Sequence, residues 1–294
     1  MDKVKLFFVG GFLGSGKTTA IVQAARHLLE QGQKVGVITN DQGAQQVDTQ
    51  FIKAHRIPSG EVTNGCFCCR YDELEKNMES LQKLEQTEVI FAESVGTCTD
   101  LAATVVNPVL SFNPGRYDIV LSIYADIRLL VKFLQDGRSV FYDNVSYIYE
   151  KQLREADIIV ANKVDLLSEK QLDMARKLIR SAYRGKLVLF QNSLLEDSVQ
   201  RWLAACFIIN NSSLRPSLEI DYAIYGAGEA ELAWLDEEIG IVADDNSAAT
   251  AAQILCRKLY DKIIGGGHLI GHLKFLVDDG EKQKKISFTS LPAI

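Results

Sequence analysis

The segment GGFLGSGKTT, residues 10–19, constrains the fold of this chain more than any other feature. It contains the pattern Gly11-x4-Gly16-Lys17-Thr18, in which glycines let backbone N–H groups surround phosphate oxygens. Lys17 supplies a cation near the β and γ phosphates, and the Thr18 hydroxyl is a ligand for Mg²⁺. The alternative is a chance match. However, the apolar run before the segment and the amphipathic run after it predict strand, loop and helix, which is the context that such a site requires.

Short apolar runs alternate with longer amphipathic stretches along most of the chain. The runs are rich in β-branched residues and nearly continuous, as expected for strands buried on both faces of a parallel sheet. Helical spacing of apolar residues predicts helices over 17–31 and 73–84. The sequence therefore predicts an α/β fold, a P-loop NTPase with a mostly parallel sheet flanked by helices. The predicted strands are 4–9, 35–39, 89–92, 119–124, 158–161 and 187–190.

The amino-acid composition changes at residues 208–221, where Asn, Ser and Pro cluster as in a linker. The elements predicted beyond it are a strand over 231–242, a helix over 247–264, and strands over 269–277 and 285–289. We therefore expect two domains. The first is a nucleotide-binding domain at 1–210, and the second is a small C-terminal α+β domain at 220–294.

Charge and cysteine content argue against several classes of protein. A net charge of −6 over 294 residues disfavours a nucleic-acid partner, which would need clustered Lys and Arg. Six cysteines are too few for a disulfide scaffold in a chain of this size, so a cytoplasmic location is expected. No stretch approaches the roughly 20 continuous apolar residues that span a bilayer, so no membrane association is expected.

A second nucleotide signal lies in ADIIVANKVDLL, where Asn162-Lys163-x-Asp165 follows an apolar strand. A carboxylate at this place can accept hydrogen bonds from N1–H and the 2-amino group of guanine. Adenine lacks these donors, so ATP would leave Asp165 unpaired. The stem of Lys163 can lie over the purine. The alternative is an ordinary polar turn. Ser193, after the next strand, is a weaker candidate for contact with the base.

Three acidic residues follow predicted strands and should reach the same edge of the sheet as the phosphate loop. Glu93 and Asp126 could each hold Mg²⁺ through water. Glu93 is favoured because Gly96 gives the following loop a pivot toward a γ-phosphate, whereas Asp126 is the better candidate for a structural cap. Asp41 could bind the metal or position water, with an ordinary turn as the alternative. The predicted catalytic residues are Lys17, Asp41 and Glu93.

The segment NGCFCC places three cysteines, Cys66, Cys68 and Cys69, in four consecutive positions. Thiolates select zinc, cobalt, nickel or copper(I) over Mg²⁺. All three can share an ion only if the chain turns, because neighbouring side chains of an extended strand point to opposite sides. Three local ligands with an open or borrowed fourth position suit a metal that is acquired and handed on. Cys98 is a candidate for the borrowed ligand. Redox chemistry and buried structural thiols are the alternatives.

Taken in order, several segments resemble the motifs of the CobW family of GTPases, relatives of the nickel-insertion GTPases of urease and hydrogenase maturation. The segments are GGFLGSGKTT, TNDQG, NGCFCCRYDEL, ESVG, YADI, EKQLREADIIVANKVDLL and NSL. The resemblance implies a metallochaperone that depends on GTP and Mg²⁺ and carries Zn²⁺, Co²⁺ or Ni²⁺. It implies that phosphates are bound by Gly11, Gly14, Ser15, Gly16, Lys17, Thr18 and Thr19, guanine by Asn162, Lys163 and Asp165, and the carried metal by Cys66, Cys68 and Cys69.

The chain departs from the family pattern in three places. Ala44 stands where the family usually has a glutamate, and residues 97–100 replace a common Ala-Asp-Pro stretch. The His-rich loop of many members is absent from a chain with four histidines. These departures indicate a divergent branch of the family. Because some relatives accompany cobalamin or corrinoid systems, the client could be a corrinoid protein or another metalloprotein.

The expected activity is slow GTP hydrolysis coupled to metal delivery. GTP would hold the loops after residues 40 and 93, and hydrolysis would release them and alter the cysteine site. No residue is a convincing arginine finger, so a partner or a nucleotide-dependent homodimer could complete the site. Two alternatives remain open. One is an ATP-dependent small-molecule kinase, and the other is a scaffold or metal sensor that holds nucleotide without hydrolysing it.

Overall fold

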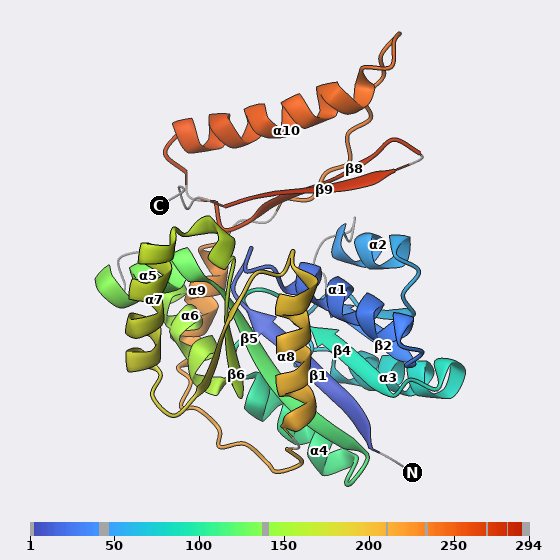
Figure 1. Ribbon diagram of the computed structural model, residues 1–294, viewed down its shortest axis with the longest axis vertical. Helices are drawn as coiled ribbons and strands as arrows, with labels where there is room; N and C mark the ends of the chain where they lie inside the picture. Colours follow the sequence, from blue (N-terminus) through green and yellow to red (C-terminus); the bar gives the residue numbers. More distant parts are fainter. Residues whose placement is uncertain are drawn as a thin grey trace.

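The computed structural model describes residues 3–40, 47–136, 141–209, 211–232, 235–268, 270–280 and 282–289. Seven strands form one parallel sheet in the order β3-β2-β4-β1-β5-β6-β7 (Figure 1). The strands are β1 Val4–Gly11, β2 Val35–Asn40, β3 Ser59–Val62, β4 Val89–Glu93, β5 Tyr117–Asp126, β6 Ile158–Asn162 and β7 Leu187–Gln191.

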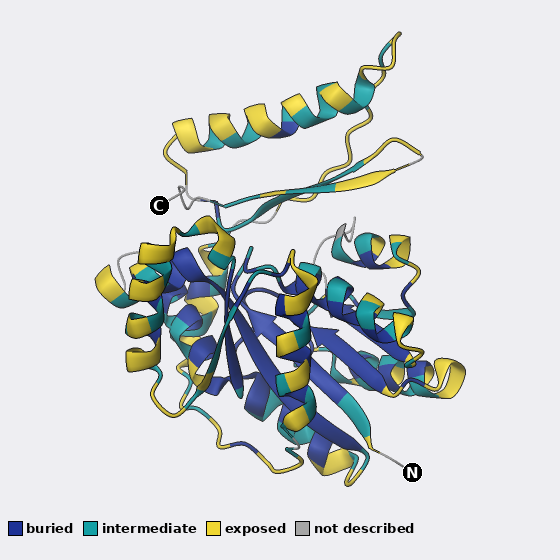
Figure 2. Ribbon diagram, in the orientation of Figure 1, coloured by how far each residue is buried: buried dark blue, intermediate teal, exposed yellow. Residues whose placement is uncertain are grey.

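Helices cover both faces of the sheet, and each face has its own apolar core (Figure 2). One core includes side chains of α1 (Lys17–Glu30), α2 (Val47–Ala54) and α8 (Glu196–Ile208). The helices of the opposite face are α3 Tyr71–Glu85, the π-helix η1 Ala102–Val106, α4 Asn107–Phe112, α5 Ile127–Asp136, α6 Asp143–Glu155 and α7 Glu169–Ala182. Apolar strands with two covered faces confirm the predicted fold class.

The six predicted strands are all present, and each end lies within two residues of its predicted place. Strands β2, β4, β5 and β6 are buried along their whole length, which explains their nearly continuous apolar sequence. Strand β3 was not predicted. Its sequence, SGEV, is short and only partly buried at the edge of the sheet, so it carries no apolar run.

The register of the sheet brings the carboxyl ends of its central strands together. Val9 of β1 pairs with Glu93 of β4. Asp126 of β5 pairs with Asn162 of β6, which in turn pairs with Gln191 of β7. The polar residues that end these strands therefore lie along one edge, beside the loop between β1 and α1.

The C-terminal part contains α9 (Tyr222–Ala230), α10 (Ala248–Gly265) and an antiparallel hairpin of β8 (Leu273–Asp278) and β9 (Gln283–Phe288). Helix α10 and both strands were predicted, and α9 was not. Helix α9 packs against α6 of the main domain. The boundary between residues 210 and 220 therefore stays a prediction. Figure 1 shows α10 and the hairpin as a layer across the carboxyl edge of the main sheet.

The strand predicted over 231–242 is wrong. Its described residues, 231–232 and 235–242, form no strand. Leu235, Ile239 and Val242 are 87%, 60% and 94% exposed. The partial alternation of apolar and acidic residues therefore belongs to a surface segment rather than to a half-buried strand. Among the described helices, none is long and apolar enough to cross a membrane.

Glu155 ends α6 and is buried beneath the segment that leads into η1, where its Oε2 accepts a hydrogen bond from the N–H of Ala102 (3.0 Å). Burial raises the pKa of Glu155 to about 8, well above the value of about 4.3 in an unfolded chain. Between these values the folded protein binds more protons than the unfolded chain. Its stability therefore falls as pH rises, by up to about 1.4 kcal/mol per pH unit.

Glu155→Gln should remove this pH dependence, because glutamine does not ionise. We expect the unfolding free energy of the variant to rise relative to wild type between pH 5 and pH 8, with little difference near pH 4.5. Urea unfolding of the metal-free proteins at several pH values measures this. A difference that stays constant with pH would show that Glu155 does not titrate in this range.

Candidate nucleotide and metal site

The phosphate loop joins β1 to α1. Gly11, Gly14 and Gly16 have positive φ angles of 124°, 69° and 93°. A Cβ atom on Gly16 would lie 2.4 Å from Nδ2 of Asn162, so the backbone conformation and its neighbour both require glycine there. Helix α1 begins at Lys17 without a side-chain cap from the described residues. Its first N–H groups are therefore directed at the place where an anion would bind.

Lys17 and Thr18 open the helix and are both buried. The Nζ of Lys17 donates hydrogen bonds to the carbonyls of Gly11 (2.8 Å) and Phe12 (3.4 Å). Burial lowers the pKa of Lys17, and the negative charge of Glu93 opposes this effect. A polyphosphate in the loop would stabilise the charged ammonium further. Thr19 follows in the first turn of the same helix.

Glu93 and Thr18 form the best site for Mg²⁺. The Thr18 hydroxyl donates a hydrogen bond to Oε1 of Glu93 (2.9 Å). Oε2 of Glu93 is buried and has no hydrogen-bond partner among the described residues. Burial, with the nearby charge of Asp48, raises the pKa of Glu93 to about 7. A divalent cation would satisfy the second oxygen and favour the ionised carboxylate, so this pair fits Mg²⁺. Asp41 lies outside the described residues, and its role stays a prediction.

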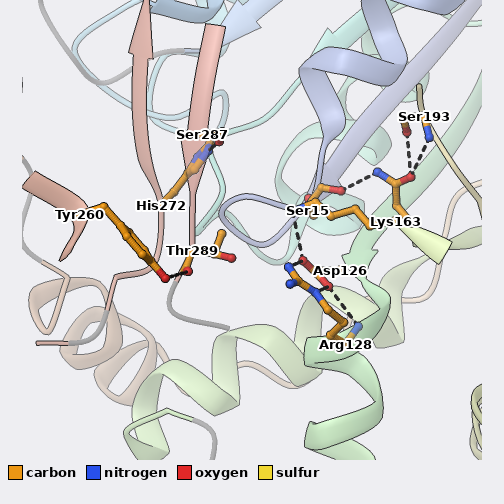
Figure 3. A network of polar contacts seen from close by, with 10 residues as sticks. Ser15, Asp126, Arg128, Lys163, Ser193, Tyr260, His272, Ser287 and Thr289 are labelled. Atoms are coloured by element: carbon orange, nitrogen blue, oxygen red, sulfur yellow. Dashed lines mark hydrogen bonds and ion pairs between the residues drawn. The ribbon is translucent and has the colours of Figure 1, made fainter. Parts of the chain in front are cut away.

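Asp126, the other acid at the end of a strand, is occupied by protein partners. Its carboxylate accepts hydrogen bonds from the backbone N–H (3.0 Å), Nε (3.0 Å) and Nη2 (2.7 Å) of Arg128. Its Oδ2 also forms an ion pair with Lys163 (3.0 Å) (Figure 3). Burial acts to raise the pKa of Asp126, but these cations hold it below its usual value. Asp126 is therefore a structural cap that also positions Lys163.

Asn162 joins the phosphate loop to the loop after β7. Its Nδ2 donates to the carbonyl of Ser15 (2.8 Å), and its Oδ1 accepts from the N–H (3.1 Å) and Oγ (2.8 Å) of Ser193. Asp165 lies nearby in the short helix η3 (Val164–Leu166) and is exposed. Its carboxylate makes no hydrogen bond or ion pair with any described residue, so it is available to a base.

The three cysteines lie in a turn between β3 and α3, as the metal prediction requires. Their sulfur atoms are all within 4.8 Å of one another, and the Sγ of Cys69 lies 3.3 Å from that of Cys66 and 3.8 Å from that of Cys68. Asn40, which ends β2, holds this turn. Its Nδ2 donates to the carbonyl of Gly65 (2.7 Å), and its Oδ1 accepts from the N–H of Phe67 (3.0 Å).

The thiols of this group differ in their pKa values. The hydrogen bond with the Cys68 thiol, with a further interaction with Cys98, holds the pKa of Cys66 well below its usual range. Interaction with Cys66 raises the pKa values of Cys68 and Cys98. None of the four is in a disulfide. The three sulfurs of the cysteine turn are a suitable donor set for a soft cation, and Cys98 is not among the sulfurs that lie within 4.8 Å of one another.

The sequence model of the family described as "CobW/HypB/UreG, nucleotide-binding domain" matches residues 5–190. The chain belongs to the CobW/HypB/UreG family. Among its relatives, the "Zinc chaperone YjiA" of Escherichia coli (strain K12) is 31% identical over 181 residues, 58% of this chain and 52% of the relative. The "Zinc chaperone CobW" of Sinorhizobium sp is 28% identical over 212 residues, 64% of this chain and 59% of the relative.

A eukaryotic relative is the "Zinc-regulated GTPase metalloprotein activator 1" of Schizosaccharomyces pombe (strain 972 / ATCC 24843). It is 26% identical over 197 residues, 61% of this chain and 43% of the relative. The chain thus spans about half the length of these curated relatives. The CobW/HypB/UreG match ends at residue 190, so helices α8, α9 and α10 and the C-terminal hairpin lie outside it.

Helix α9 adds contacts to the CobW/HypB/UreG domain that no motif predicted. Thr97, in the loop after Glu93, donates a hydrogen bond to Oε1 of Glu229 (2.9 Å). The hydroxyl of Tyr222 donates to Oδ2 of Asp100 in the same loop (2.6 Å). These contacts hold the loop that carries Cys98. Sequence reasoning missed them because α9 lies beside a linker-like segment and its partners are over 120 residues away.

Proposed function

We propose that this chain is a metallochaperone that binds and hydrolyses GTP with Mg²⁺ and delivers a transition metal to a client protein. Membership of the CobW/HypB/UreG family supports this, and so do the names of relatives, which include zinc chaperones and a zinc-regulated GTPase. Zinc is the favoured cargo on these names. Cobalt and nickel are the competitors that a thiolate site would also accept.

The observation that supports this proposal most directly is that one loop connects the phosphate site to the neighbourhood of the cysteine turn. Thr18 of the phosphate loop bonds to Glu93, and the loop after Glu93 carries Cys98. Interaction with Cys66 and burial raise the pKa of the Cys98 thiol, so this loop lies near the cysteine turn. A nucleotide that engages Thr18 and Glu93 would therefore act on the segment that touches the metal ligands.

The proposed roles follow the positions of the side chains. Mg²⁺ bound by Thr18 and Glu93 would neutralise charge on the β and γ phosphates. Lys17 and the loop N–H groups would stabilise the γ-phosphoryl group as water displaces GDP, with Asp41 as the proposed water-positioning residue. The remaining contacts are assigned to Gly11, Gly14, Ser15, Gly16 and Thr19 for phosphate, to Asn162, Lys163, Asp165 and Ser193 for the guanine pocket, and to Cys66, Cys68 and Cys69 for the cargo.

The wider proposal covers location, partners and division of labour. The chain would act in the cytoplasm, where thiols stay reduced. Its client would be a metalloprotein or a corrinoid protein, and a nucleotide-dependent homodimer would form during the cycle. Residues 1–210 would carry both sites, and residues 220–294 would form a second unit that contacts them.

Single-turnover hydrolysis tests this function. The protein is mixed with GTP and Mg²⁺, with and without one equivalent of Zn²⁺, and GDP is quantified over time. We expect hydrolysis of GTP, little hydrolysis of ATP, and a rate that changes when the cysteine site is loaded.

The alternatives give different results in the same assay. A small-molecule kinase would prefer ATP and would turn over only with an acceptor present. A scaffold or sensor would bind GTP and release it uncleaved, with or without metal. Either result would contradict the proposed function.

A further inference from the structure

The C-terminal hairpin lies directly on the phosphate loop. A Cβ atom on Gly14 would be 2.6 Å from Cγ2 of Thr289 and 3.6 Å from the carbonyl oxygen of Gly271 and from Cδ2 of His272. A Cβ on Gly271 would be 3.0 Å from Cδ1 of Leu13. Figure 3 shows His272 and Thr289 beside the loop that contains Ser15. Segments over 250 residues apart in the sequence therefore meet at the nucleotide site.

One face of the hairpin presents two lysines to this site. Leu276 of β8 pairs directly with Lys285 of β9, so Lys274, two residues before Leu276, lies on the same face. The Nζ of Lys274 lies 2.7 Å from Oδ2 of Asp48, and the Nζ of Lys285 lies 2.6 Å from Oδ1 of Asp48. Lys284 points to the other face, where its Nζ donates to Gln253 of α10 (2.8 Å).

The charges of this face act on the groups that would hold phosphate and Mg²⁺. Burial is the main cause of the lowered pKa of Lys17. The positive charge of Lys274 lowers this pKa further, and the negative charge of Asp48 raises it. Burial is also the main cause of the raised pKa of Glu93. The negative charge of Asp48 raises this pKa further, and the positive charge of Lys285 lowers it. The charged groups here are the cations Lys17, Lys274 and Lys285 and the carboxylates Asp48 and Glu93. With more cations than carboxylates, this cluster would be stabilised by a further anion.

His272 adds a polar group without adding charge. Burial lowers its pKa to about 3, so the ring is neutral at physiological pH. Its Nε2 shares a hydrogen bond with Oγ of Ser287 on the opposite strand (Figure 3). Of the three side chains His272, Lys274 and Lys285, only the two lysines therefore give the face that contacts the phosphate loop its positive charge.

We infer that Lys274 and Lys285 are phosphate ligands supplied in cis by the C-terminal hairpin, which bind the β and γ phosphates of the nucleotide held by the phosphate loop. In this arrangement they supply the positive charge that the sequence lacks in the form of an arginine finger. Asp48 is their partner when no phosphate is bound. The inference rests on the proposed function, because it assigns further ligands to the same nucleotide.

Lys274→Gln/Lys285→Gln should weaken GTP binding by about 10- to 100-fold, since each lysine loses a charge-assisted contact. GDP should be affected less, and GMP should be unaffected because it lacks both outer phosphates. Fluorescence titration of the full chain with GTP, GDP and GMP in the presence of Mg²⁺ measures the three affinities. Lys284→Gln is the matched control, which removes the same charge from the other face, and it should change each affinity less than about twofold.

A purely structural ion-pair cluster gives a different pattern. If the lysines only fasten the hairpin to α2, the double variant will lose the same factor for all three nucleotides or none, and the inference is then overturned. Hydrogen exchange on the wild-type protein gives a second test that does not depend on the variant folding. GTP should slow exchange of the β8 and β9 amides more than GMP does, and equal protection would overturn the inference. A wild-type chain that binds no GTP would instead defeat the proposed function, and this inference with it.

Discussion

Asp165→Asn should weaken GTP binding by about 100- to 1000-fold while leaving ATP binding unchanged. In the proposed complex the exposed carboxylate of Asp165 accepts hydrogen bonds from N1–H and the 2-amino group of guanine. Hydrogen bonds to a charged acceptor are worth about 1.5–3 kcal/mol each, and the variant also turns an amide N–H toward a guanine donor. Titration with GTP and ATP in the presence of Mg²⁺ measures the change.

Two controls make this result specific. Xanthosine triphosphate carries an oxygen where guanine has the 2-amino group, so it should bind Asp165→Asn better than it binds wild type, because the asparagine N–H can donate to it. Asp173→Asn removes another exposed carboxylate, which pairs with Arg176 on α7, and should leave every nucleotide affinity unchanged. A variant at Asp165 that keeps the preference for GTP would contradict the assignment of the guanine pocket.

Cys66→Ser should lower zinc affinity by about 100-fold or more. Cys66 is close to both other cysteines of the turn, with its Sγ 2.6 Å from that of Cys68 and 3.3 Å from that of Cys69, and its pKa lies well below the usual range. A serine hydroxyl does not ionise near neutral pH and is a poor ligand for a soft cation. Removing a residue that only supports a metal ligand typically lowers metal affinity by about 10- to 100-fold. Removing a direct ligand should lower it at least as much. Competition with a chromogenic chelator measures the affinity.

Cys256→Ser is the matched control for that measurement. Cys256 is a free, buried cysteine on α10 and belongs to no metal-binding group among the described residues. Its replacement should leave zinc affinity within about twofold of wild type. An equal loss in both variants would indicate general destabilisation, and no loss in Cys66→Ser would exclude the cysteine turn as the metal site.

The parts of the fold that could be predicted carry local signals. The parallel strands are apolar runs because helices cover both faces, and the phosphate loop needs glycines whose φ angles are positive. The expectation that Asp126 is a structural cap also agrees with its contacts to Arg128 and Lys163. In these cases the residues that decide the structure lie close together in the sequence or follow a strand end.

The parts that could not be predicted depend on contacts between distant segments. Nothing near Lys274 in the sequence indicates that it pairs with Asp48, which lies 226 residues earlier. The surface segment at 231–242 has partial alternation but no neighbouring strand, and its exposed Leu235 and Val242 show that alternation alone does not bury a chain. Strand β3 and helix α9 were missed for the related reason that tertiary packing, more than their own pattern, holds them in place.

The central claim is that the nucleotide state controls the affinity of the cysteine turn for its metal. The most direct test is a zinc-chelator competition on the same protein sample, with Mg²⁺ and either a non-hydrolysable GTP analogue or GDP. We predict at least about tenfold tighter zinc binding with the GTP analogue, which is a coupling free energy of about 1.4 kcal/mol. Equal zinc affinity in the two nucleotide states would contradict the account, because the Thr18–Glu93 contact and the loop after Glu93 would then transmit nothing to the cysteine turn.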